Sequence, residues 1–198
     1  MQVRELLVPG AFEFTPVQHG DDRGLFLEWF KIEKLVEAVG HPLTLAQANL
    51  SVSKAATLRG VHFADVPPGQ AKYVYCPTGA LLDVIVDVRV GSPTFGQWTS
   101  VRLDAEKLNA VYLSEGLGHG FVALEDDTAI AYICSEGYNP GAERGISPVD
   151  PALGLPWPSD IEPILSDKDR DAPTLAEAQA AGLLPVYADC LAYRAKLS

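Results

Sequence analysis

The clearest pattern along the chain is a two-residue alternation of side chains over 81–90. In this segment, LLDVIVDVRV, every even position is leucine or valine, whereas the odd positions include Asp83, Asp87 and Arg89. Successive residues of a strand point to opposite faces of its sheet. The alternation therefore predicts a β-strand over 81–90 with one wholly apolar face.

Shorter strand-like runs follow, separated by turns rich in Gly, Pro and Asp. They lie at 97–103, 109–113, 120–124 and 128–135. Several short strands between such turns are typical of a β-sandwich or barrel.

Two helices are predicted outside this β-rich middle. One covers 31–39, where apolar residues recur at helical spacing before Gly40. The other covers 174–181, where Thr174 and Glu177 have the spacing of a capping box.

The length and composition fit one domain. The chain has 198 residues, of which 47% are hydrophobic, enough to build a sizeable core. We predict a single all-β domain over 1–198, with a β-rich body over about 1–165 and a helical tail over about 166–198.

The formal net charge of -11 at pH 7 argues against nucleic acid or an anionic membrane as a partner. An anionic ligand therefore has to meet a local cluster of basic groups. No run approaches the ~20 apolar residues of a membrane span, and the first residues lack the apolar core of a signal peptide. Cys76, Cys134 and Cys190 form no Cys-x-x-Cys pair. We predict a cytoplasmic protein with no nucleic-acid or membrane partner.

Several common catalytic signatures are missing. The glycine-rich segment 116–120 is not followed by a helical pattern, which argues against a dinucleotide-binding fold. The chain has no phosphate-binding P-loop and no Gly-x-Ser-x-Gly nucleophile turn. No two of the four histidines are spaced i, i+2 or i, i+4, as a strand or helix would require to hold a metal. A transition-metal site is therefore disfavoured.

The stretch 58–72 places Arg59, His62 and Lys72 among glycines, prolines and apolar residues. On a regular strand Arg59 and His62 would point to opposite faces, but a bulge or bend at Gly60 would bring both to one side. Taken alone, His62 is more consistent with a neutral core histidine bonded to a backbone carbonyl than with a catalytic residue. Lys72 is equally consistent with a solvated residue at a strand edge.

Two further segments carry polar groups whose role the pattern leaves open. Tyr132 lies in an apolar strand-like run, where a phenol either bonds to the backbone or performs chemistry. The charged segment 165–171, which contains Asp169, is by itself typical of a solvated loop. Neither segment indicates a function alone.

A series of short motifs gains meaning when the motifs are taken together and in order. They are DRGLFLE (22–28), QANLS (47–51), LRGVHF (58–63), QAK (70–72), DVIVDVR (83–89), SPTFG (92–96), GHGF (118–121) and YNP (138–140). In order and spacing they resemble the dTDP-4-dehydrorhamnose 3,5-epimerase family. The resemblance implies a cupin-type jelly roll and a homodimer. It also implies action on a dTDP-linked 4-keto-6-deoxyhexose without a metal or redox cofactor.

The resemblance also implies catalytic roles. The C4 ketone of such a sugar acidifies the hydrogens on C3 and C5. Inversion therefore needs a base on one face, stabilisation of an enolate, and an acid on the other face. His62 would be the base with Asp169 as its partner. Tyr132 would be the acid, and Lys72 would face the enolate oxygen.

A second set of residues is implied to bind the nucleotide sugar. Arg59 and Arg23 would contact the diphosphate, and Tyr138 would stack on thymine. The other residues implied to line the site are Glu28, Gln47, Asn49, His119, Glu143 and Lys168. Some of this set would come from the partner subunit.

The sequence leaves the number of inverted carbons open. Inversion of C3 and C5 would give dTDP-4-dehydro-L-rhamnose, in dTDP-L-rhamnose biosynthesis. Sister enzymes of antibiotic deoxysugar pathways invert one carbon and share the same His, Tyr and Lys. Two other classes are a sugar-binding cupin without catalysis and a metal-dependent cupin enzyme. The last is weakened by the missing His-x-His.

Overall fold

The computed structural model of the chain describes residues 1–197. The strands are β1 (Gln2–Glu5), β2 (Ala11–Thr15), β3 (Gln18–Asp21), β4 (Gly24–Leu27), β5 (Gln47–Ser53), β6 (Leu58–Ala64), β7 (Lys72–Thr78), β8 (Ala80–Val86), β9 (Trp98–Asp104), β10 (Ala110–Leu113), β11 (Gly118–Ala123), β12 (Thr128–Cys134) and β13 (Glu143–Gly145). The helices are α1 (Ile32–Val39), α2 (Asp167–Arg170), α3 (Leu175–Ala180) and α4 (Tyr187–Arg194).

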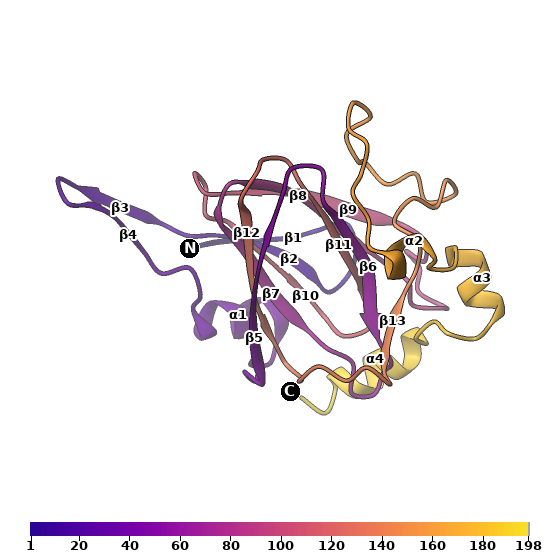
Figure 1. The fold of residues 1–198 in the computed structure, drawn as a ribbon. Coiled ribbons are helices and arrows are strands. Elements are labelled where there is room, and N and C mark those ends of the chain that lie inside the picture. Colours follow the sequence, from indigo (N-terminus) through magenta and orange to yellow (C-terminus); the bar gives the residue numbers. More distant parts are fainter. Residues whose placement is uncertain (198) are drawn as a thin grey trace.

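Two antiparallel sheets lie face to face as the layers of a sandwich (Figure 1). One has six strands in the order β1-β2-β10-β7-β12-β5, and the other has five in the order β13-β6-β11-β8-β9. The all-β class and the cupin-type sandwich expected from the sequence are confirmed. The strands predicted after residue 90 correspond to β9, β10, β11 and β12.

The predicted strand over 81–90 shows how the layers are filled. Its first part is β8, in which Leu81 and Ile85 point into the apolar cluster between the two sheets. Val84 and Val86 point to the outer face of the five-stranded sheet, where the segment that contains α3 packs on them. Both faces of β8 are therefore buried. Its odd-numbered side chains lie between the two sheets, and Val84 and Val86 lie beneath the α3 segment.

The strand ends at Val86, earlier than the alternation predicts. Asp87 is fully buried and accepts hydrogen bonds from the guanidinium of Arg89 and from the hydroxyls of Ser92 and Thr94. Burial raises the pKa of the Asp87 carboxyl, but these donors outweigh burial and hold the pKa below its usual range. The Asp87 backbone still pairs with Gln97 and Gly96, and beyond it this side-chain network holds the turn together.

The two predicted helices are confirmed. Lys31 precedes α1, and Gly40 ends it in the left-handed region with φ of 93°. Thr174 and Glu177 form the expected capping box at the start of α3. The predicted helical tail also contains α2 and α4. Within residues 1–197 we find no helix with the length and apolar character that crossing a bilayer requires.

A bend in β6 at Gly60 brings its polar residues together. Gly60 has φ of 126°, and a Cβ there would lie 2.5 Å from Gly120 Cα and 2.7 Å from the His119 carbonyl oxygen. The register of β6 against β11 shifts at this point. Arg59 and His62 consequently line the same cavity, as the sequence predicted.

The hairpin formed by β3 and β4 extends away from the sandwich (Figure 1). Its apolar side chains Leu25 and Phe26 are exposed, the second by 67%. On the body, β5 is the edge strand of its sheet and exposes Leu50 and Val52. The hairpin and this edge are thus two apolar surfaces that nothing in the described chain covers.

Candidate active site

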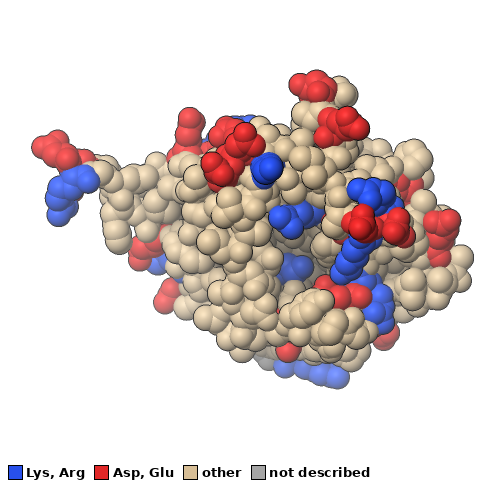
Figure 2. Space-filling view, viewed as in Figure 1, with Lys and Arg blue, Asp and Glu red and all other residues tan. Residues whose placement is uncertain are grey.

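A cavity of about 240 Å³ opens between the two sheets. Its lining residues are Ser51, Lys72 and Tyr132 from the six-stranded sheet, Arg59, His62, His119 and Phe121 from the five-stranded sheet, and Ser166, Lys168 and Asp169 at α2. Lysine and arginine side chains are visible inside the hollow in Figure 2. An acidic protein thus concentrates basic groups at one place.

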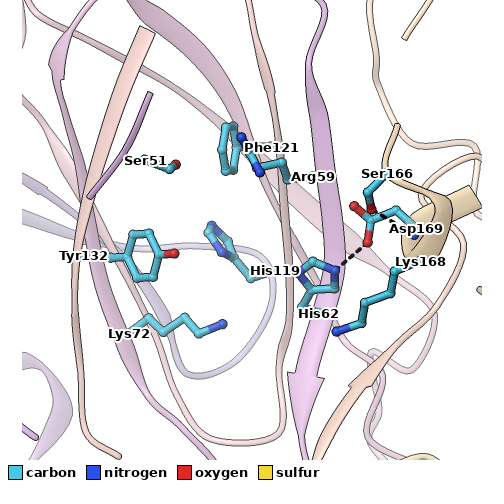
Figure 3. Close-up of a pocket in the computed structure, with 10 residues that line it drawn as sticks. All are labelled: Ser51, Arg59, His62, Lys72, His119, Phe121, Tyr132, Ser166, Lys168 and Asp169. Carbon is cyan, nitrogen blue, oxygen red and sulfur yellow. Dashed lines mark hydrogen bonds and ion pairs between the residues drawn. The ribbon is translucent and has the colours of Figure 1, made fainter. Parts of the chain in front are cut away.

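His62 and Asp169 form a hydrogen-bonded pair at one wall of the cavity (Figure 3). His62 Nε2 lies 2.6 Å from Asp169 Oδ1. Burial raises the pKa of Asp169, but hydrogen bonds from His62 and Ser166 outweigh it and keep the pKa below its usual value. Because the ionised carboxylate can only accept, His62 Nε2 donates the proton, and Nδ1 is left to accept one from a ligand.

The opposite wall carries a phenol and an ammonium group. The side chains of Tyr132 and Lys72 point from the six-stranded sheet toward the histidines (Figure 3). Burial raises the pKa of Tyr132, so its hydroxyl keeps its proton at neutral pH. Burial lowers the pKa of Lys72, and the nearby Glu143 carboxylate acts in the opposite direction.

A second histidine and carboxylate lie beside the first pair. His119 is directly opposite His62 in the pairing of β11 with β6. Its Nε2 lies 2.7 Å from Asp83 Oδ2, and Asp83 is only 1% exposed. His119 was predicted to line the site, but Asp83 was not.

Four of the predicted site residues lie just beyond the cavity lining. They are Gln47, Asn49, Tyr138 and Glu143. Gln47 donates to Asn49 Oδ1 at 2.7 Å and accepts from the Tyr138 amide at 2.8 Å. The Tyr138 ring itself is 64% exposed. These contacts fix the loop before β13 against β5, beside the cavity.

Arg23 and Glu28 are far from the cavity of their own chain. Arg23 lies in the β3–β4 hairpin and pairs with Asp21, and Glu28 pairs with Lys31. The pairing holds the pKa of Glu28 below its usual value. One chain does not bring these two predicted residues to the cavity.

Sequence reasoning missed three residues of the lining, Ser51, Phe121 and Ser166. Ser51 follows Asn49 by two positions and Phe121 follows His119 by two, so strand periodicity would have placed each on the predicted site face. Ser166 accepts from the Asp169 amide as the N-cap of α2, a pattern readable from a serine three residues before Asp169.

The arrangement suits proton transfer at a carbon atom. A carboxylate-backed imidazole on one sheet faces a protonated phenol on the other, with an ammonium group beside the phenol to stabilise negative charge. Within residues 1–197, no three His, Cys, Asp or Glu side chains are grouped so that they could hold a metal ion.

Comparisons with known proteins agree with this chemistry. A family model described as dTDP-4-dehydrorhamnose 3,5-epimerase matches residues 5–177. The chain is 55% identical over 193 residues to the dTDP-4-dehydrorhamnose 3,5-epimerase of Mycolicibacterium smegmatis, covering 98% of this chain and 95% of that protein.

Solved structures extend the likeness to the whole fold. The rmlC epimerase of Mycobacterium tuberculosis has a TM-score of 0.98 at 48% identity, with 100% of both chains covered. ChmJ, a 3'-monoepimerase from Streptomyces bikiniensis in complex with dTDP-quinovose, has a TM-score of 0.95 at 50% identity, with 97% of both chains covered. This chain therefore belongs to the dTDP-4-dehydrorhamnose 3,5-epimerase family, and as an epimerase it is an isomerase.

Proposed function

We propose that this enzyme inverts both C3 and C5 of dTDP-4-dehydro-6-deoxy-D-glucose to give dTDP-4-dehydro-L-rhamnose, in dTDP-L-rhamnose biosynthesis. The observation that carries the proposal is the placement of His62 and Tyr132 on facing sheets, with Lys72 beside them in one cavity. The dTDP-quinovose in the ChmJ complex supports a dTDP-linked 6-deoxyhexose as the ligand class.

The first step is removal of a carbon-bound proton. His62 Nδ1 takes the proton from C3 or C5, and the electron pair moves onto the C4 ketone oxygen to form an enolate. Asp169 stabilises the imidazolium that results, and Lys72 stabilises the enolate oxygen. Such fixed charges in a partly buried site lower the barrier because they need no reorganisation during the reaction.

The second step completes the inversion. Tyr132 donates its phenolic proton to the opposite face of the same carbon, and the electron pair returns from oxygen to carbon as the ketone re-forms. Proton exchange with solvent then resets His62 and Tyr132. A repeat of the cycle at the other carbon inverts the second centre without any change in oxidation state.

Arg59 and Lys168 supply positive charge at the cavity for the diphosphate. Arg59 also donates to Ser53 Oγ at 3.3 Å, which orients the guanidinium. A guanidinium forms forked, charge-assisted bonds with anionic oxygens, so we assign the diphosphate to Arg59.

Deuterium labelling tests the number of inverted carbons. In deuterated water, the pure enzyme should place deuterium at both C3 and C5 of dTDP-4-dehydro-6-deoxy-D-glucose, with both configurations inverted, as read by NMR. Label and inversion at one carbon alone would identify a mono-epimerase. The absence of label at both carbons would exclude epimerase action on this substrate.

We further propose a cytoplasmic homodimer in which the β3–β4 hairpin enters the partner's site. The exposed Leu25 and Phe26 of the hairpin and the exposed Leu50 and Val52 of β5 supply apolar surface for such an interface. The exchange would bring Arg23 and Glu28 to the diphosphate and sugar of the partner. The buried, unpaired thiols of all three cysteines fit a reducing compartment.

Mixing two defective variants tests this exchange. Arg23→Ala should weaken substrate binding and His62→Asn should abolish proton removal. Heterodimers then contain one site with an intact hairpin and an intact base. When the two variants are co-expressed, about a quarter of all sites should therefore be intact. The measured kcat/KM per subunit should reach about a quarter of the wild-type value. A mixture no more active than its components, or a monomer in sedimentation equilibrium, would refute the exchange.

A further inference from the structure

We propose that Asp83 is a positioning residue of this epimerase, holding His119 against the sugar and supplying negative charge to the Lys72 ammonium group on the facing sheet. The inference rests on the proposed function, in which Lys72 stabilises the enolate. It assigns a task to a carboxylate that does not itself line the cavity.

Asp83 is a buried carboxylate with a hydrogen bond to only one of its two oxygens. Asp83 is 1% exposed and points between the sheets, on the same face of β8 as Leu81 and Ile85. Its Oδ2 is bonded to His119 Nε2, but its Oδ1 has no hydrogen-bond partner among residues 1–197. A buried carboxylate oxygen without a donor is costly, so packing alone does not account for an aspartate here.

Asp87 is a buried carboxylate with a structural role, and its hydrogen bonds can be compared with those of Asp83. It is as deeply buried as Asp83 and lies only four positions further along. Its two oxygens accept from the Arg89 guanidinium and from the hydroxyls of Ser92 and Thr94. Asp83, by contrast, has a single donor, and that donor is His119, a residue that lines the cavity. The difference indicates that Asp83 serves the site rather than the fold.

The pKa of Lys72 depends on burial and on several charged groups around it, Asp83 among them. Burial lowers the pKa of its ammonium group, which opposes the charged form that enolate stabilisation requires. Glu143 from β13, Cys134 from β12 and Asp83 from β8 act to raise this pKa, and Lys168 from α2 acts to lower it. Asp83 is therefore one of the groups that keep Lys72 protonated in a dry site.

The same carboxylate fixes the ring of His119. Because Asp83 accepts at Nε2, Nδ1 is the ring nitrogen left to bond a ligand, on a residue that lies directly opposite His62 in the pairing of β11 with β6. One buried aspartate thus couples an imidazole on the five-stranded sheet to an ammonium group on the facing sheet.

Asp83→Asn tests the inference through a pH profile. The change is nearly isosteric and removes a buried negative charge, one oxygen of which has no donor, so the variant should fold with an unchanged or higher Tm. Its kcat should fall about 10-fold to 100-fold. Removing the negative charge should lower the Lys72 pKa further. The decline of kcat at alkaline pH should therefore begin at lower pH than in the wild type.

Asp104→Asn is the matched control. Asp104 is also a buried aspartate, at the end of β9, but it caps a turn by accepting from the Glu106 and Lys107 amides. This variant should lose stability and keep the wild-type pH profile. In a Lys72→Ala background, adding Asp83→Asn should leave the alkaline limb where Lys72→Ala alone places it.

Several outcomes would overturn the inference. They are an Asp83→Asn variant that does not fold, one with a wild-type kcat, and one whose alkaline limb does not move. A wild-type enzyme that labels neither C3 nor C5 would instead reject the proposed function. Labelling by the wild type together with an unaffected Asp83→Asn variant would reject the role of Asp83 alone.

Discussion

Replacing His62 by asparagine should lower kcat for dTDP-4-dehydro-6-deoxy-D-glucose about 100-fold to 10,000-fold, the range that a positioned general base contributes. Asparagine retains a polar group toward Asp169 but cannot take a proton at the position of Nδ1. The His62 side chain is 30% exposed, so its replacement should change Tm little. Product formation followed by NMR, with deuterium incorporation at C3 and C5, measures the loss.

His41→Asn is the control for this result. His41 is buried outside the cavity, with Nδ1 3.1 Å from the Pro42 carbonyl oxygen. Its replacement should leave kcat near the wild-type value even if some stability is lost. Wild-type incorporation of deuterium by the His62→Asn variant would show that another group removes the proton.

Replacing Tyr132 by phenylalanine should separate proton exchange from inversion. The variant keeps His62, so a proton can still leave C3 or C5, and a deuteron can return to the face from which it left. Delivery to the opposite face should fall about 100-fold or more, because the phenolic proton is missing. We therefore expect starting material that gains deuterium while almost no inverted product forms, both read from one NMR time course.

Tyr75→Phe controls for loss of a tyrosine hydroxyl. The Tyr75 ring stacks on Trp29 at 4.3 Å on the outer side of the six-stranded sheet, outside the cavity lining. This variant should invert both carbons at the wild-type rate. If exchange and inversion disappear together in the Tyr132→Phe variant, Tyr132 takes part in proton removal rather than in proton delivery.

Strand periodicity predicted β8 to β12 but not how deeply these strands are buried. The alternation over 81–90 assigned each side chain to the correct face of β8. It could not show that the face shared by Asp83 and Ile85 points between two sheets, because what covers a face depends on distant segments. The end of the strand was missed for a related reason, since Asp87 bonds to side chains that a two-residue pattern does not take into account.

The site was predicted through the resemblance rather than through periodicity. The prediction that a bend at Gly60 would bring Arg59 and His62 together is confirmed by the shared cavity. The pairing of His62 with Asp169 spans 107 positions of the chain, and no local pattern connects them. Arg23 shows a different limit, because its proposed site lies on another copy of the chain.

The division of the cavity between two sheets has a consequence for how the enzyme tolerates change. The base belongs to one layer and the acid to the other, and the distance between them is set by the side chains that separate the layers, among them Ile85, Val74 and Ile130. Close-packed interiors relax only partly when a side chain is shortened. The apolar side chains between the sheets therefore set the distance from the Tyr132 hydroxyl to the substrate carbon that it protonates.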